Sequence, residues 1–213
     1  MIGIIDYGVG NLFSLKSSLA YLGCDNIVTK DAEDLKRCEK IILPGVGAFE
    51  DAIKKLNETG LIPLIREELD KGKPMLGICL GMQLLFEESF EYGEHNGLGL
   101  IPGAVMPIPK KQRDLENGEV LKIPHIGWNR LMIKKDDPLF SKLPEENYVY
   151  FVHSYYATGC QDNLLAVADY GVEIPAVVRK GSLYGTQFHP EKSGQTGLNI
   201  LRAFVDLGQE DFR

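Results

Sequence analysis

The sequence predicts one α/β domain, residues 1–213, built on a central sheet that is mostly parallel but mixed and is flanked by helices. Two observations predict this fold class. In the first half of the chain, short apolar runs alternate with helical patterns, as is typical of parallel strands joined by crossover helices. After Gly93, glycine- and proline-rich connections separate further short apolar runs, which favours additional strands. We see no linker, low-complexity tract or repeat that would divide the chain.

The elements of the first half follow from its apolar spacing. A helix is predicted after the first strand, with four leucines on one face, Asn11 as its N-cap and Gly23 at its C-terminal cap. Two more helices are predicted over residues 49–57 and 61–70, and Pro63 fits the first turn of the second. Another helix is predicted to follow the fourth strand directly and to run through Phe86. The predicted strands are residues 2–5, 27–28, 41–43 and 75–78.

The second half is predicted to contain mainly short strands and to close with a helix. Leu198, Leu201 and Val205 have helical spacing and define the last helix. The predicted strands lie near residues 104–108, 130–133, 148–152, 165–168, 176–178 and 183–188.

Composition and charge narrow the classes of partner. The chain has 30 acidic and 23 basic residues, a net charge of -7, which leaves no broad basic face for nucleic acid. No apolar run is long enough to cross a bilayer, and the N-terminus begins as a strand without the pattern of a signal peptide. The four cysteines are widely spread and show neither paired nor metal-ligand spacing. We therefore predict a cytoplasmic protein without a metal, membrane or nucleic-acid site.

Cys79 lies in the stretch GICLGMQ, between a strand pattern and a helical pattern. Glycines two residues before and two after it give the G-x-nucleophile-x-G form, in which a tight turn holds a reactive side chain out toward a substrate. A thiol at a helix N-terminus is also favoured as thiolate, the attacking species. An isolated cysteine is more often a small, inert, buried thiol. The flanking glycines favour a nucleophile here.

His189 is the base that the sequence favours for this nucleophile. The segment GTQFHPEKS places His189 at the end of a strand pattern and Glu191 two residues later, so both side chains are predicted on one side of an extended segment. A carboxylate there fixes the imidazole tautomer and stabilises its protonated form. By contrast, His95 and His125 lie in glycine- or proline-rich stretches, and His153, within YFVHSYY, fits a hydrogen-bonded structural histidine at least as well.

A glycine-rich loop, LPGVGAF, follows the third predicted strand. Because the carboxyl ends of parallel strands share one edge of a sheet, we expect this loop to lie beside the Cys79 turn. The backbone N–H groups of Gly45, Val46 and Gly47, together with the N–H of Leu80, are predicted to stabilise an oxyanion. Alone, PGVG is also an ordinary strand-to-helix connection.

Taken together, PGVGAF, GICLGMQ and FHPEKS resemble the class I glutamine amidotransferase family, which uses the order Cys, then His-x-Glu. The stretches IIDYGVGNL, LGMQLLFEES, PHIGWN and YFVHSYY extend the resemblance over essentially the whole chain. The resemblance implies a flavodoxin-like fold. It also implies that Cys79, His189 and Glu191 form a triad that hydrolyses L-glutamine through a glutamyl thioester.

The same resemblance implies substrate-binding residues. Gln83 lies one helical turn after Cys79, on the same face, at a position that the family uses for the substrate. Ser154 and Tyr155 match the segment that holds the backbone of the glutamine ligand. The plainer interpretations are a solvent-facing helical glutamine and an ordinary strand.

A partner is also implied, because the glutaminase uses the whole length of the chain and leaves no acceptor domain. The most similar members of the family form a heterodimer with a (β/α)8-barrel cyclase subunit, which receives the ammonia in histidine biosynthesis, and they need no cofactor. Asn11, Trp128 and Lys192 lie in segments that resemble the partner-facing region. Their plainer roles are a helix cap, a core aromatic and a solvated lysine.

Alternative functions remain open at this point. A stand-alone Cys-His-Glu hydrolase, such as a γ-glutamyl peptidase, would share the catalytic motifs. An ammonia-supplying subunit for another acceptor enzyme, for example in amination of a nucleotide sugar, would also share them. A non-catalytic flavodoxin-like scaffold predicts that Cys79→Ala changes no activity.

Overall fold

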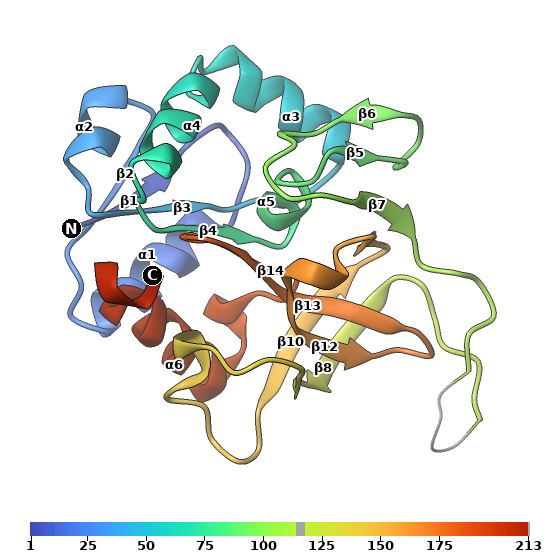
Figure 1. Cartoon of the computed structure of the whole chain (residues 1–213). Coiled ribbons are helices and arrows are strands. Elements are labelled where there is room, and N and C mark those ends of the chain that lie inside the picture. Colours follow the sequence, from blue (N-terminus) through green and yellow to red (C-terminus); the bar gives the residue numbers. More distant parts are fainter. Residues whose placement is uncertain (114–117, 213) are drawn as a thin grey trace.

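A computed structural model describes residues 1–113 and 118–212 of the chain. Its central sheet has eight strands in the order β2-β1-β3-β4-β14-β13-β12-β9 (Figure 1). The pairings from β2 to β14 are parallel and those from β14 to β9 are antiparallel, so the predicted mixed sheet is confirmed. In this order the strands span Asn26–Thr29, Ile2–Ile5, Lys40–Leu43, Met75–Ile78, Leu183–Thr186, Glu173–Lys180, Leu164–Asp169 and Met132–Ile133.

Two small sheets extend the molecule beyond the central one. Antiparallel β10 (Tyr148–His153) and β8 (His125–Arg130) form the first. The second has the order β11-β7-β5-β6, with strands at Tyr155–Thr158, Ala104–Pro107, Glu88–Ser89 and His95–Asn96. The sequence did not predict β5, β6, β8 or β11: the first two are only two residues long, β8 lies in a stretch with proline and glycine, and β11 follows β10 after a single residue.

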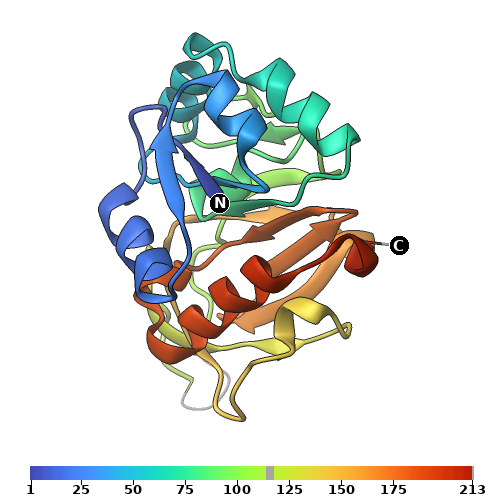
Figure 2. The same ribbon diagram turned by 90° about the vertical axis from the view of Figure 1, so that its left-hand side faces the viewer.

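Helices cover both faces of the central sheet (Figures 1 and 2). The strand residues alternate between the two layers: Ile4 packs with the apolar residues of α1 and α6, whereas Ile5 packs with those of α2, α3 and α4. These helices are α1 (Leu12–Tyr21), α2 (Ala32–Arg37), α3 (Phe49–Glu58), α4 (Ile62–Asp70) and α6 (Gly194–Asp206). The remaining helical segments are α5 (Leu80–Gln83) and the 3₁₀ turns η1 (Pro138–Phe140), η2 (Gln161–Asn163), η3 (Pro190–Lys192) and η4 (Gln209–Phe212).

The N-terminal ends of two helices differ from expectation. Asn11 precedes α1 as predicted, but its side chain makes no capping hydrogen bond. The unpredicted helix α2 has a fully formed cap, in which Asp31 accepts hydrogen bonds from the backbone N–H groups of Glu33 and Asp34. With one apolar side chain buried, Leu35, this six-residue helix has too little hydrophobic periodicity to be seen in the sequence.

The helix predicted after β4 is also shorter than expected. α5 ends at Gln83, and Leu84 to Phe86 follow in turns. The carbonyl oxygens of Leu84 and Phe86 accept hydrogen bonds from Leu98 and Gly99, partners distant in sequence. Because these bonds replace the next helical ones, the chain leaves the helix after one turn.

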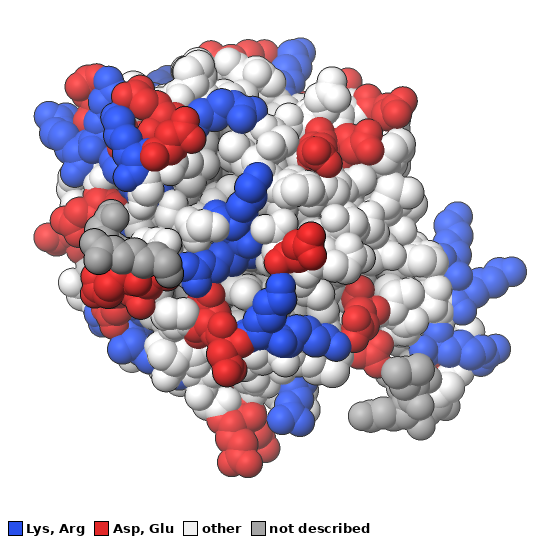
Figure 3. Space-filling model, viewed as in Figure 1, with Lys and Arg blue, Asp and Glu red and all other residues white. Residues whose placement is uncertain are grey.

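On the side of the molecule shown in Figure 3, positive and negative side chains are interspersed and separated by uncharged areas. Within residues 1–113 and 118–212, no helix has the length and apolar character needed to span a membrane.

The strand order places three loops at one edge of the central sheet. β3, β4 and β14 are adjacent and parallel, so their carboxyl ends lie side by side. The glycine-rich loop follows β3, Cys79 follows β4, and the segment with His189 follows β14. This edge is where ligands bind in open parallel sheets.

Candidate active site

Cys79 is held in a strained turn directly after β4. Its backbone has φ 54° and ψ -111°, a conformation that is uncommon for a residue other than glycine. Its N–H donates a 2.7 Å hydrogen bond to the carbonyl oxygen of Thr186 in β14. Gly81 is required beside it, since a Cβ there would lie 1.9 Å from the carbonyl oxygen of Leu43. Backbone packing against β3 and β14 therefore fixes the position of the thiol.

The short α5 changes one part of the sequence argument. A helix of four residues carries only a small part of the dipole that a longer helix would present to the thiol. The thiol also interacts with a side chain, because Cys79 is one of the groups that raise the pKa of His189.

His189 and Glu191 form a buried pair. The His189 Nδ1 and Glu191 Oε1 atoms are 2.8 Å apart, and the two side chains are only 2% and 3% exposed. Glu191 lies in the 3₁₀ turn η3, so the extended segment that the sequence predicted is wrong, although the pair still meets. The backbone N–H of His189 donates to the carbonyl oxygen of Tyr150, and its carbonyl oxygen accepts from the Ser193 hydroxyl at 2.6 Å. Both ends of the histidine are thus anchored.

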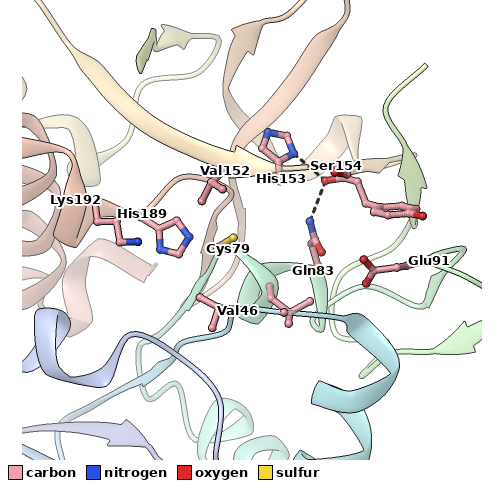
Figure 4. Close-up of a pocket in the computed structure, with 12 residues that line it drawn as sticks. Val46, Cys79, Gln83, Glu91, Val152, His153, Ser154, His189 and Lys192 are labelled. Atoms are coloured by element: carbon pink, nitrogen blue, oxygen red, sulfur yellow. Dashed lines mark hydrogen bonds between the residues drawn. The ribbon is translucent and has the colours of Figure 1, made fainter. Parts of the chain in front are cut away.

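The charge state of His189 depends on its neighbours. Burial alone would lower its pKa, but Cys79 and Glu191 outweigh burial and raise the pKa of His189 to about 10. Its Nε2 atom is buried without a hydrogen-bond partner among the described residues. Figure 4 shows Cys79 between His189 on one side and Gln83 on the other. The arrangement suits a protonated imidazole beside a thiolate, with Nε2 able to deliver a proton into the pocket.

The glycine-rich loop lies against the start of α5. A Cβ on Gly45 would be 2.6 Å from the backbone nitrogen of Gly81, so only glycine permits this approach. The hydroxyl of Tyr7 donates a 2.7 Å hydrogen bond to the carbonyl oxygen of Pro44 and fixes the loop from β1. Val46 and Gly47 line the same pocket as Cys79.

The pocket has a volume of about 280 Å³, and most of the sequence-predicted site residues line it, whereas Gly45, Glu191 and Asn11 line a small cavity beside it. Gln83, Ser154 and Tyr155 line the pocket as well. The Gln83 Nε2 atom donates a 2.9 Å hydrogen bond to the carbonyl oxygen of Tyr155 (Figure 4). The wall opposite Cys79 is therefore tied to α5 by the glutamine side chain.

One pocket residue, Glu91, and one buried neighbour of Cys79, Gln187, were missed by sequence reasoning. Glu91 lines the pocket, and its Oε2 atom accepts a 2.5 Å hydrogen bond from the backbone N–H of Phe49 at the start of α3. Burial raises the pKa of Glu91, and the hydrogen bond from Phe49 opposes this. Gln187 is fully buried beside Cys79. Glu91 lies in an acidic, glycine-containing stretch without a motif, whereas Gln187 stood inside GTQFHPEKS and was given no role.

His153 belongs to a different buried pair. Its Nε2 atom lies 3.0 Å from Nδ1 of His125, its direct neighbour across β10 and β8, and its Nδ1 lies 2.8 Å from the carbonyl oxygen of Tyr155. The His125 Nε2 atom lies 2.7 Å from Oδ1 of Asn129. His125 is thus buried in a strand, not in a loop as the sequence suggested. Burial is the main cause that lowers the pKa of both histidines, that of His153 to about 3.

The residues predicted to face a partner lie at the rim of the site. Trp128 is 61% exposed on β8, so the interpretation as a core aromatic is wrong. Its ring is 4.8 Å, centroid to centroid, from Tyr150, and the Nζ of Lys192 lies 6.0 Å from the centroid of Tyr150. Asn11 lines a small cavity next to Glu191. Across the described part of the chain, no group of three His, Cys, Asp or Glu side chains could hold a metal ion.

Comparison with known proteins gives a consistent result. Residues 3–207 match the family model "Glutamine amidotransferase class-I". The imidazole glycerol phosphate synthase subunit HisH of Caldanaerobacter subterraneus subsp. tengcongensis is 52% identical over 208 residues, covering 97% of this chain and 98% of that protein. The subunit HisH of Bacillus subtilis is 50% identical over 211 residues, covering 99% and 98%.

Solved structures show the same fold at lower identity. A crystal structure of a glutamine amidotransferase has a TM-score of 0.72 at 21% identity, covering 96% of this chain and 97% of that chain. The structure of PurLQS from Thermotoga maritima has a TM-score of 0.71 at 19% identity, with the same coverage. Since the family model spans nearly the whole chain and relatives share half of its residues over their full length, the chain belongs to the class-I glutamine amidotransferase family, alongside the HisH subunits of imidazole glycerol phosphate synthase.

Proposed function

We propose that this chain is the glutaminase subunit of an imidazole glycerol phosphate synthase in histidine biosynthesis, and that it hydrolyses L-glutamine to glutamate and ammonia. The observation that carries the proposal is the pocket itself. It joins a cysteine in a strained turn to a buried histidine whose other nitrogen lies 2.8 Å from a carboxylate. The relatives with about half of their residues identical are named as subunits of that synthase.

The polar groups of the pocket match the two ends of glutamine. Glu91 offers a carboxylate at the end of the pocket away from His189 (Figure 4), which suits the α-ammonium group of an amino acid. The backbone of Ser154 and Tyr155 is proposed to hold the α-carboxylate of the ligand, and Gln83 lines the same pocket and is tied to Tyr155. The side-chain amide of the ligand then points toward Cys79.

The first chemical step is attack by the Cys79 thiolate on the carboxamide carbon. The oxygen of that carbon becomes an oxyanion, for which the N–H groups of the Gly45 to Gly47 loop and of Leu80 are the proposed donors. As the C–N bond breaks, His189 transfers its Nε2 proton to the leaving nitrogen, and ammonia departs. A glutamyl thioester on Cys79 and a neutral His189 remain.

The second step regenerates the enzyme. Neutral His189 accepts a proton from water, which attacks the thioester carbon, and the C–S bond breaks to release glutamate and the thiolate. Glu191 acts throughout on Nδ1 of His189, where it fixes the tautomer and stabilises the imidazolium. No cofactor is required by this scheme.

A partner is part of the proposal, because ammonia released into water is mostly ammonium, which has no lone pair for attack. We propose a heterodimer with a (β/α)8-barrel cyclase subunit in the cytoplasm. Support comes from β8, whose outer face exposes Ile126 and Trp128, 58% and 61%, next to the rim of the pocket. Large exposed apolar side chains at a rim favour a protein interface. Asn11 and Lys192 would flank it.

The test is a glutaminase assay of the full chain, alone and mixed with the cyclase subunit of the same organism. We expect glutamate release to rise sharply in the complex when the cyclase ligand is present, and to vanish in Cys79→Ala. γ-Glutamyl peptides serve as competing substrates. Preference for such peptides over glutamine, or a Cys79→Ala chain with full activity, would overturn the proposal.

A further inference from the structure

Gln187 connects the nucleophile to the opposite wall of the pocket. It lies just after β14, is 0% exposed, and its backbone N–H donates to the carbonyl oxygen of Ala176 at 2.9 Å. Its side-chain Nε2 lies 3.8 Å from Sγ of Cys79, and its Oε1 accepts a 3.0 Å hydrogen bond from Nε2 of Gln83. One rigidly placed amide therefore touches both Cys79 and Gln83.

The chemistry of the sulfur fixes the direction of this chain of hydrogen bonds. A thiolate has no proton and only accepts hydrogen bonds, so Gln187 must turn its NH₂ group to Cys79 and its carbonyl oxygen to Gln83. Gln83 must then present its NH₂ group to Gln187. Its two N–H bonds are both used, one by Gln187 and one by the carbonyl oxygen of Tyr155. The Oε1 atom of Gln83 is the group left for the ligand.

We propose that Gln187 is a positioning residue that stabilises the Cys79 thiolate and orients Gln83 so that its carbonyl oxygen faces the substrate. This inference rests on the proposed function, since it assumes that Cys79 is the nucleophile. An N–H donor next to a thiolate favours the charged form and holds the sulfur in one rotamer. An acceptor at Gln83 selects a ligand that offers N–H groups, as an amide or an ammonium group does.

Two substitutions separate the two effects. Gln187→Glu keeps an oxygen that accepts from Gln83, but it replaces the donor at Cys79 by a carboxylate. Gln187→Met has a similar size and removes both contacts. A third variant, Gln83→Met, keeps the amide of Gln187 beside the sulfur and removes the two hydrogen bonds that Gln83 donates, to Gln187 and to the carbonyl oxygen of Tyr155. Gln195→Met, at an exposed position of α6, is the matched control.

The first readout is the pH dependence of Cys79 alkylation by iodoacetamide in the full chain, with Cys79→Ala as the background for the other three thiols. Loss of one charge-assisted hydrogen bond is expected to move the midpoint up by about one pH unit in Gln187→Met. Gln187→Glu is expected to move it further, because its carboxylate repels the thiolate. Gln83→Met and Gln195→Met are expected to keep the midpoint of the unmodified chain.

The second readout is steady-state glutamine hydrolysis by the complex with the cyclase subunit. Gln187→Glu should lower kcat by about tenfold and leave KM nearly unchanged, because Gln83 is still held. Gln187→Met should lower kcat and also raise KM by about tenfold. A merely structural role predicts a lowered melting temperature without a shift in the alkylation midpoint.

The outcomes distinguish the inference from the function on which it rests. If the unmodified complex fails to hydrolyse glutamine, the proposed function is wrong. If it is active but Gln187→Met and Gln187→Glu keep its alkylation midpoint and its kcat, the role of Gln187 alone is refuted. Should Gln187→Met fail to fold, the other two variants still test the inference. An unshifted alkylation midpoint in Gln187→Glu contradicts it, and so does a shifted alkylation midpoint in Gln83→Met.

Discussion

His189 and His153 both line the pocket and are 2% and 6% exposed, yet their surroundings drive their pKa values in opposite directions. Burial lowers the pKa of each. At His189 a thiol and a carboxylate outweigh burial and raise the pKa to about 10, whereas at His153 the second histidine, His125, adds to burial and the pKa falls to about 3. Anionic neighbours, rather than depth in the protein, thus decide which histidine carries a proton.

The two sites consequently stabilise the fold in different pH ranges. Relative to an ordinary value of 6.5, His189 holds its proton more tightly when folded, so its contribution is complete below 6.5 and is lost as the pH rises toward about 10. His153 resists protonation when folded. Its contribution is complete above 6.5 and is lost as the pH falls toward about 3. One pocket therefore combines a histidine that favours the protonated form with a histidine that favours the neutral form.

The largest expected loss of activity follows from replacing His189, the proposed catalytic histidine of the pair. His189→Ala should lower the rate of glutamine hydrolysis by the complex by about 10⁴-fold, because proton transfer to the leaving group and activation of water are both lost. The measurement is glutamate release under saturating glutamine. In His153→Gln the same rate should fall by about tenfold at most, since that side chain contacts His125 and the carbonyl oxygen of Tyr155 and is given no part in proton transfer. Equal losses in the two variants would show that both histidines share the catalytic role.

Glu191→Gln sharpens the comparison, because it keeps the shape of the carboxylate and removes its charge. We expect kcat to fall by about 10³-fold, as an amide stabilises the imidazolium poorly. The pKa of His189 should also fall, so the alkaline limb of the kcat/KM profile should move to lower pH. Glu58→Gln, an exposed position at the end of α3, serves as the control. An unmoved alkaline limb in Glu191→Gln would mean that Glu191 does not set the charge of His189.

The sequence predicted that Cys79, His189 and the glycine-rich loop lie close together because short motifs mark their places at strand ends, and the structure brings Cys79, His189, Val46 and Gly47 to one pocket. Glu191 was found for the wrong reason, as its contact arises in the turn η3 and not in an extended segment. Glu91 and Gln187 had no signal of their own. Their positions depend on contacts with residues far along the chain, Phe49 for Glu91 and Gln83 for Gln187.

The elements of the fold were likewise predicted where their signal is local and missed where they depend on contacts distant in sequence. The parallel core was predicted because most of its strands are short apolar runs and its helices other than α2 carry their own apolar period. The early end of α5 was not, because it depends on hydrogen bonds from Leu98 and Gly99 to carbonyl oxygens in the turn. The strand β8 was missed because Pro124 and Gly127 in PHIGWN indicate a loop, while pairing with β10 gives it a partner for every residue.

The stability of the protein at acid pH tests whether buried His153 stays neutral in the folded chain. Between about pH 6.5 and pH 4.5, the unfolded chain binds a proton at His153 and the folded chain does not, so this residue should lower the free energy of unfolding by about 2–3 kcal/mol. In His153→Gln the decline over the same range should be shallower by that amount. Urea titrations at a series of pH values give the slopes of both proteins. Parallel slopes would contradict a neutral, buried His153.

The smallest expected effect concerns the outer face of the sheet whose inner face holds His125 and His153. Trp128 lies on the outer face, where its ring packs on Tyr150 and is exposed to solvent. Trp128→Ala should weaken binding of the cyclase subunit by about tenfold, as loss of an aromatic anchor does at protein interfaces. Titration calorimetry measures this affinity. The acid stability of the isolated chain should stay unchanged, because the histidine pair faces inward and keeps its contacts. A Trp128→Ala chain that binds the cyclase subunit normally but unfolds at a higher pH than the unmodified chain would place the role of Trp128 inside the fold rather than at the interface.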